Sequence, residues 1–196
     1  EEIHSNNSSD TGVKPQNVVF NTLGTKMFVI QNRTASGNNT QDRVNEFPLS
    51  TAFDITTAGS PVNFEIQSQE TAPRGLAFNT LGTRMFVLGA QHDEINVYSL
   101  SAGFDLSSTI TYVGAFNVST QDDTPTGVTF NNDGTKMFVV GSGSGNVNEY
   151  TLSCAFKVTA SSTCDAPQKI KEVRGIVDAK INTAKNFAND SNQYGI

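Results

Sequence analysis

The side chains that could do chemistry are few and mostly isolated. The chain contains two histidines, His4 and His92, and neither stands at a spacing typical of metal ligands. The segment Gln91-His92-Asp93-Glu94 places an imidazole beside two carboxylates, which could act as a general acid and base. The same composition is typical of a polar hairpin loop, which is the interpretation that we favour. No serine or cysteine has a partnered base in the sequence, so no catalytic residue is predicted.

The two cysteines, Cys154 and Cys164, lie ten residues apart. They could form a disulfide, bind a metal ion, or remain free thiols in a reducing compartment. Two thiols without a nearby histidine do not suit a metal site. The sequence therefore favours a Cys154–Cys164 disulfide, which would stabilise the fold by about 2–3 kcal/mol.

These residues belong to a chain that contains three copies of one motif. The sequence FNTLGTKMFV at residues 20–29 returns almost unchanged at residues 78–87 and 130–139. A proline precedes each copy, and Pro15, Pro73 and Pro125 place successive units 58 and 52 residues apart. Steps near 50 residues are typical of four-stranded propeller blades that stack and share a core.

Each unit is predicted to be a series of short β-strands. Residues 17–20 and 26–30 flank a turn in which Gly24 can take a positive φ, as a tight hairpin requires. Third strands are expected at residues 44–50, 95–101 and 147–153, each with an aromatic residue and a leucine on one face. Fourth strands are expected at residues 62–66 and 112–118, and the third unit has no equivalent. We therefore predict an all-β protein of three four-stranded antiparallel blades, the third of them incomplete.

The end of the chain has a different pattern. Apolar residues three to five positions apart, from Ile170 to Phe187, indicate an amphipathic α-helix. The expected segments are an N-terminal segment at 1–14, blades at 15–72, 73–124 and 125–166, the helix at 167–188 and a flexible tail at 189–196. Residues 2–5 resemble residues 65–68, so the N-terminal segment could supply a strand that completes a blade.

Three blades are too few for a closed propeller, which needs about 4 to 8. Three arrangements remain open. Two chains could form a six-bladed ring, the chain could be part of a longer array, or strands could be donated in series to make a polymer. We favour closure or a longer array, so the expected partners are a second copy or further blades.

Composition favours an extracellular or cell-surface protein. Charged residues make up 16% of the chain, while Ser, Thr, Asn and Gly are plentiful. No run of about 18 apolar residues is present, so no membrane span is predicted. The net charge of −6 argues against a nucleic-acid partner, because phosphate binding relies on clustered Lys and Arg.

The repeat also resembles a known family. PTGVTFNNDGTKMFVV at residues 125–140, followed by VNEYTLS at 147–153, resembles the repeat of YVTN-type and lactonase-like β-propellers. LSTAFDI at residues 49–55 is similar to repeats in uncharacterised surface and phage-associated proteins of marine bacteria. The resemblance covers about residues 12–158 and implies a blade array used for adhesion or assembly outside the cytoplasm.

The resemblance also implies a place for a metal ion. Lactonase-like propellers hold a divalent ion with Glu, Asn and Asp side chains in the central channel, and such oxygen ligands suit Ca²⁺. The candidates by repetition are Asn45, Asn96, Asn148, Glu46 and Glu149. They lie on the third strand, away from the axis of a usual blade. Hydrogen bonds to the adjoining loop explain their recurrence more simply, so no cofactor is predicted and Ca²⁺ stays an alternative.

The sequence thus predicts a non-enzymatic binding or structural module that acts in adhesion or assembly through blade edges and loops. Its expected ligand is a surface glycan or a protein, because loops on a rigid scaffold carry binding variation. The expected binding-loop residues are Asn32, Asn38, Gln91, His92, Asp93 and Glu94. Two alternatives remain: a metal-dependent lactonase-like hydrolase, and a virion or filament subunit that polymerises by strand donation.

Overall fold

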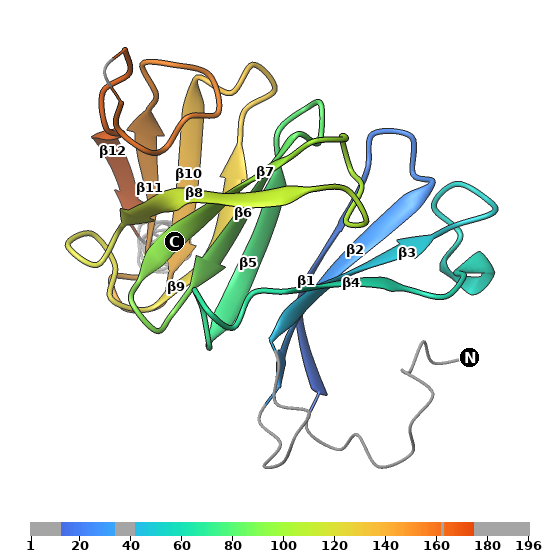
Figure 1. Cartoon of the computed structure of the whole chain (residues 1–196). Coiled ribbons are helices and arrows are strands. Elements are labelled where there is room, and N and C mark those ends of the chain that lie inside the picture. The colour runs from blue at the N-terminus through green and yellow to red at the C-terminus, as the bar shows by residue number, and fades with distance from the viewer. Residues whose placement is uncertain (1–12, 34–41, 162, 175–196) are drawn as a thin grey trace, which may run out of the picture.

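The computed structural model describes residues 13–33, 42–161 and 163–174, which form three four-stranded antiparallel sheets without an α-helix (Figure 1). Blade 1 contains β1 (Val13–Phe20), β2 (Lys26–Arg33), β3 (Arg43–Pro48) and β4 (Val62–Glu65). Blade 2 contains β5 (Pro73–Phe78), β6 (Arg84–Gly89), β7 (Glu94–Leu100) and β8 (Ile110–Asn117). Blade 3 contains β9 (Pro125–Phe130), β10 (Lys136–Gly141), β11 (Asn146–Thr151) and β12 (Gln168–Arg174). The prediction of three four-stranded antiparallel blades is confirmed.

The three blades lie side by side in chain order, with blade 2 in the middle (Figure 1). The first strands of the blades lie innermost in the array, where β5 contacts both β1 and β9. A short 3-10 turn, η1 (Ile55–Thr57), lies between β3 and β4. The arrangement is that of consecutive propeller blades around an axis.

The core consists of two apolar layers, one on each face of blade 2. Side chains alternate along a strand, so neighbouring residues of β6 enter different layers. Met85 and Val87 face blade 1, whereas Phe86 and Leu88 face blade 3, and all four are fully buried. The middle blade is therefore covered on both faces, as a sheet with two apolar faces requires.

The aromatic and leucine pairs of the third strands lie on the face toward the preceding blade. Tyr98 and Leu100 belong to the layer between blades 1 and 2, and Tyr150 and Leu152 belong to the layer between blades 2 and 3. The matching pair of blade 1, Phe47 and Leu49, lies on the outer face of the array, where the described residues contain no further blade.

The repeated hairpin is fixed by a glycine and an aromatic ring. Gly24 has φ of 70°, as predicted for the turn, and the Asn21 side chain accepts a hydrogen bond from the Lys26 N–H at 3.0 Å. Gly82 repeats this turn with φ of 69°, and the Phe104 N–H donates to its carbonyl at 3.0 Å. A Cβ atom on Gly82 would overlap the Phe104 ring. Glycine is therefore needed both for its φ and for the close approach of the ring.

The helix predicted at 167–188 is wrong within the described residues. Gln168–Arg174 forms β12, which pairs antiparallel with β11, and residues 175–188 lie outside the described part of the chain. Ile170 lies at a β-bulge, where the register with β11 shifts between Lys169 and Lys171, so the apolar residues Ile170 and Val173 do not follow the alternation of a regular strand. Spacing over one short strand could not distinguish a strand from a helix, and the hydrogen-bonding edge of β11 decided the structure.

Blade 3 therefore has the fourth strand that the sequence analysis did not find. The place beside β11 that the N-terminal segment 1–14 could have filled is occupied by β12. Residues 1–12 and the predicted tail at 189–196 lie outside the described residues. Within the described residues, strand donation is not needed to complete a blade.

A disulfide joins Cys154 to Cys164, with their Cα atoms 5.7 Å apart. The pairing agrees with the prediction from the sequence. It ties the end of β11 to the segment that leads into β12, so the fourth strand of blade 3 is covalently fixed near the third.

The ring packed on the hairpin glycine gives a testable prediction. We expect Gly82→Ala to lower the free energy of unfolding by more than about 2 kcal/mol, because it adds a ring overlap to the strain of a positive φ. Gly145 has φ of 65° and open space around its missing Cβ, so Gly145→Ala should cost only about 1–2 kcal/mol. Urea unfolding of both variants would show this difference. Equal losses would contradict a role of the Phe104 ring.

Candidate functional site

A hollow of about 470 Å³ lies along the inner strands β1, β5 and β9. Its apolar lining includes Phe20, Phe78 and Phe130. Its polar lining is asparagine and threonine, and among the described residues no Asp, Glu, His or Cys lines it. Such a surface can exchange hydrogen bonds with neutral groups, but it offers no carboxylate for a metal ion and no general base.

Some side-chain amides of the hollow already form hydrogen bonds within the protein. The Asn79 side chain accepts a hydrogen bond from the Arg84 N–H at 2.9 Å and donates to Thr83 Oγ1 at 3.1 Å. Asn131 repeats these bonds with Lys136 and Thr135 in blade 3. These amides hold the hairpins in place, which leaves less of their hydrogen-bonding capacity for a ligand.

The asparagines singled out by repetition lie in the blades and do not line the hollow. Asn45 donates to the Val29 carbonyl at 3.5 Å, and Asn96 accepts from the Tyr112 hydroxyl at 3.2 Å. Both partners are on neighbouring strands, so the expected bonds to the adjoining loop are wrong. The buried Asn148 side chain has no protein partner within the described residues.

The described part of the chain contains no set of ligands for the alternative of a bound Ca²⁺ ion. There, no three His, Cys, Asp or Glu side chains lie close enough together to hold a metal ion. The two glutamates that the sequence offered for Ca²⁺, Glu46 and Glu149, each form an ion pair with a lysine instead.

Four of the six predicted binding-loop residues are neighbours at one turn, and the other two lie elsewhere in the chain. Gln91 and His92 are exposed at the turn between β6 and β7, followed by Asp93 with φ of 53° and by Glu94 at the start of β7. These loop residues are held in place, because Gln91 accepts from the backbone N–H of Thr71 and the His92 carbonyl accepts from Asn117. Asn32 is buried on β2, 3.4 Å from the Thr71 carbonyl to which it donates. Asn38 lies outside the described residues.

A buried carboxyl group lies beside this turn. Glu70 is fully buried, accepts a hydrogen bond from the Ala72 N–H at 2.6 Å, and packs so closely on Gly89 that a Cβ there would overlap it. Burial raises the pKa of Glu70, and backbone hydrogen bonds and the charge of His92 oppose that shift. Burial also raises the pKa of Asp93, with the charges of Asp123 and Asp122 adding to the effect.

The raised pKa of Glu70 predicts a pH dependence of stability. The folded chain keeps this proton to higher pH than the unfolded chain, whose carboxyl titrates near 4.5. The stabilisation is full below the unfolded pKa and is lost as the pH rises through the folded pKa. The unfolding free energy of wild type minus that of Glu70→Gln should therefore fall as the pH rises above about 4.5. Urea titrations would measure it, with the exposed Glu65→Gln as control, and a rising difference would contradict the assignment.

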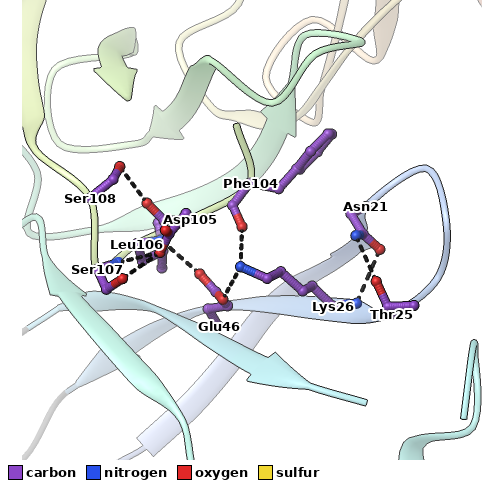
Figure 2. Close-up of polar contacts among 9 residues, drawn as sticks. All are labelled: Asn21, Thr25, Lys26, Glu46, Phe104, Asp105, Leu106, Ser107 and Ser108. Atoms are coloured by element: carbon purple, nitrogen blue, oxygen red, sulfur yellow. Dashed lines mark hydrogen bonds and ion pairs between the residues drawn. The ribbon is translucent and has the colours of Figure 1, made fainter. Parts of the chain in front are cut away.

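A group of polar contacts joins blade 1 to blade 2 (Figure 2). Lys26, at the start of β2, pairs with Glu46 of β3 at 2.6 Å between Nζ and Oε1. From blade 1 the Lys26 ammonium also donates to the Phe104 carbonyl of blade 2 at 2.7 Å. The other Glu46 oxygen accepts from the Leu106 N–H at 2.7 Å. We call this arrangement the interblade clamp: Lys26 and Glu46 holding the turn Phe104-Asp105-Leu106.

Hydrogen bonds within the turn Phe104-Asp105-Leu106-Ser107 hold its shape, in addition to the contacts with Lys26 and Glu46. Asp105 accepts hydrogen bonds from the Ser107 N–H at 2.9 Å and from the Ser107 hydroxyl at 2.6 Å (Figure 2). These bonds, with the charge of Lys26 adding to them, lower the pKa of Asp105. Because the turn is held locally, little conformational entropy is lost when Glu46 binds it.

Sequence reasoning missed the clamp, although a signal was present. From the sequence, a metal ion or an adjoining loop is the expected contact of Glu46, which is not linked there to Lys26 or to a turn of the next blade. The signal is that Lys26 and Glu46 return together as Lys136 and Glu149, whereas the middle blade has Arg84 and Val97 at these positions. A lysine and a glutamate that recur together in two of the three repeats indicate a pair in contact.

Two terminal faces remain without a neighbouring blade in the described residues. On the outer side of blade 1, Phe53 is 61% exposed and Ile55 is 50% exposed. On the outer side of blade 3, Val140, Val147 and Val173 form a row across three strands, and Val140 is 43% exposed. Large apolar side chains at such exposure mark surfaces suited to contact another protein surface.

The buried carboxylate of the clamp gives a stability prediction. Glu46→Ala should lower the free energy of unfolding by about 2–4 kcal/mol, because it leaves the Leu106 N–H without an acceptor and Lys26 without its counter-charge. Glu46→Gln keeps an acceptor oxygen and should cost only about 1–2 kcal/mol. Guanidinium unfolding would rank the two variants, with Glu65→Ala as an exposed control. Equal losses from the two substitutions would show that the Leu106 contact contributes nothing.

Similar solved structures have the same fold at low sequence identity. A protein from Lactobacillus plantarum is 17% identical, with a TM-score of 0.54 over 87% of this chain and 44% of its own. A candidate 6-phosphogluconolactonase from Bacteroides uniformis is 15% identical, with a TM-score of 0.53 over 87% of this chain and 45% of its own. The periplasmic gluconolactonase of Pseudomonas aeruginosa is 11% identical, with a TM-score of 0.52 over 86% and 43%.

These likenesses show a lactonase-like β-propeller fold and nothing of the activity. The chain spans less than half the length of each of these proteins. No protein-family model and no curated protein matches its sequence. Among the described residues, no helix has the length and apolar character needed to cross a bilayer.

Proposed function

We propose that the chain is a non-enzymatic β-propeller module of an extracellular or surface protein, which acts in adhesion or assembly through its blade faces and loops. The observation that carries this proposal is that equivalent residues of blades 1 and 2 differ in their exposure to solvent. Phe53 and Ile55 are 61% and 50% exposed, whereas Leu106, which matches Ile55 in blade 2, is 5% exposed under blade 1. A surface built to receive a blade is therefore present without a described neighbour.

The inner hollow supports a binding role more than a hydrolytic one. Its described lining offers amides, hydroxyl groups and aromatic rings, which suit a neutral polar ligand such as a glycan. Gln91 and His92, exposed at the β6–β7 turn, are the best-placed of the expected loop residues to contact a glycan or protein. A lactonase would need a metal-binding or basic group that the described lining lacks.

The disulfide supports a location outside the cytoplasm. Disulfides persist in oxidising compartments and are rare in cytosolic proteins. The Cys154–Cys164 bond lies at the surface end of blade 3, where Cys154 is partly exposed. A fixed fourth strand at a terminal blade suits a module that presents this blade to another surface.

A turnover assay tests the non-enzymatic assignment. We expect no hydrolysis of γ- and δ-lactones or aryl esters above the buffer rate, with Ca²⁺, Mg²⁺, Mn²⁺ or Zn²⁺ or with a chelator. The matched variant is Asn132→Ala, since Asn132 is exposed and lines the hollow. Metal-dependent turnover by wild type that falls in Asn132→Ala would overturn the proposal and favour the lactonase-like alternative.

A further inference from the structure

We propose that two copies of this chain close head to tail into one six-bladed ring, in which Lys136 and Glu149 of one copy hold the turn Phe53-Asp54-Ile55 of the other. Each copy would then repeat, at both of its ends, the interblade clamp found inside the chain. This inference rests on the proposed assembly function and names the partner surface and its chemistry.

The holding half of the clamp is already formed on blade 3. Lys136 Nζ lies 2.6 Å from Glu149 Oε1, the same distance as in the pair Lys26–Glu46. The position in the sheet is also the same, because Glu149 lies opposite Phe138 as Glu46 lies opposite Phe28. The Lys136 and Glu149 side chains are 46% and 18% exposed, against 29% and 6% for the clamp inside the chain. A pair with the same distance and the same place in the sheet thus lies on the outer side of blade 3, where no turn of the described residues contacts it.

The receiving half is already formed on blade 1. Asp54 accepts from the Thr56 N–H at 3.0 Å and from the Thr56 hydroxyl at 2.6 Å, which matches Asp105 and its Ser107 bonds. Phe53 has φ of 59° and donates its N–H to the Gly24 carbonyl at 2.8 Å. The turn therefore has the shape that Glu46 binds in blade 2, before any partner arrives.

The apolar surfaces next to these groups are also complementary. Ile30, Val44 and Phe64 form a row on blade 1 that packs against blade 2. The row at the same positions of blade 3 is Val140, Val147 and Val173. The surface that covers such a row inside the chain contains Phe78, Met85 and Tyr98, and blade 1 has Phe20, Met27 and Phe47 at these positions. Each terminal face is therefore the counterpart of the other.

The residues at the two internal interfaces favour this pairing. Inside the chain, the blade that has Lys26 and Glu46 faces a turn with Asp105, whereas the blade that has Arg84 and Val97 faces the turn Phe156-Lys157-Val158. Both blades have a cation, so the difference is the glutamate, which accepts from the N–H of the facing turn in the first interface and is replaced by valine in the second. Blade 3 has the lysine and glutamate, and the turn with Asp54 is the aspartate turn that no described blade faces. The match favours a second copy as the occupant.

Blade number supports closure into a ring. A propeller closes at about 4 to 8 blades, and two copies of this array supply six. The chain spans 43% to 45% of three complete structures with this fold, so two copies supply a comparable length. Two head-to-tail contacts related by a two-fold axis cover both terminal faces and leave none for a further copy.

Sedimentation equilibrium and light scattering of the whole chain test the proposal. Wild type should have twice the 21.0 kDa mass of one chain, and its mass should not grow further with concentration. Glu149→Ala and Ile55→Asn should each weaken the dimer roughly 10- to 100-fold. Glu149→Ala removes the acceptor of the clamp, and Ile55→Asn places a polar side chain where the equivalent Leu106 is buried, in each case at both contacts. Lys169→Ala breaks another ion pair on blade 3, that with Glu172, and should leave the dimer unchanged.

A mixing experiment tests the head-to-tail geometry. When Glu149→Ala and Ile55→Asn copies are mixed, one of the two contacts joins an intact Lys136–Glu149 pair to an intact Phe53-Asp54-Ile55 turn. Dimers should reappear in the mixture at concentrations where each variant alone is monomeric. Circular dichroism melting of each variant shows whether the monomer is folded, which is expected because both side chains are partly or largely exposed.

Three results would overturn the proposal. They are a wild-type monomer at all concentrations, polymers that lengthen with concentration, or a dimer whose dissociation constant is unchanged in Glu149→Ala and in Ile55→Asn. A monomer would reject the second copy as partner, polymers would reject closure into a ring, and a resistant dimer would reject the clamp as its contact. Each of these without lactone turnover would leave the non-enzymatic assignment standing. Metal-dependent turnover would reject the proposed function whatever the mass of the protein.

Discussion

The structure depends on the need of each blade to cover two apolar faces. A four-stranded sheet with large side chains on both sides cannot bury them by itself, so each blade is stable only between neighbours. Blade 2 meets this condition, and its β6 residues Met85 to Leu88 are fully buried. Blades 1 and 3 meet it on the face toward blade 2, whereas Phe53 and Val140 on their outer sides are 61% and 43% exposed. The same constraint that builds the core therefore defines the two surfaces through which the module can act.

The interblade clamp adds a directional contact to the interface between blades 1 and 2. Apolar rows such as Ile30, Val44 and Phe64 would pack against many similar surfaces, because hydrophobic burial is not directional. A buried carboxylate is different. Glu46 is favourable only where an N–H and an ammonium are both in place, since an unpaired buried charge is strongly destabilising. The clamp thus contributes selectivity between blades, and the apolar rows contribute most of the contact energy.

The repeat made much of the fold predictable. The motif around Gly24 returns twice, and its turn and flanking strands require a hairpin in each unit. The Cys154–Cys164 pair also followed from composition and spacing. The last strand was missed because β12 departs from the template and its bulge at Ile170 interrupts the alternation of apolar and polar residues that marks a strand. Pairing with β11 is a long-range effect that a single segment cannot reveal.

The site was harder to predict because its parts come from different repeats. Glu46 and Leu106 lie 60 residues apart in sequence and meet only when two blades stack. Repetition drew attention to Asn45, Asn96 and Asn148, yet these amides lie within the sheets, where repetition reflects packing. The informative feature was the variation between copies. In the middle blade Val97 stands at the position of Glu46, and the turn that this blade faces has Lys157 in place of Asp105. In a repeat protein, conserved positions thus define the blade, and positions that change together identify the contacts between blades.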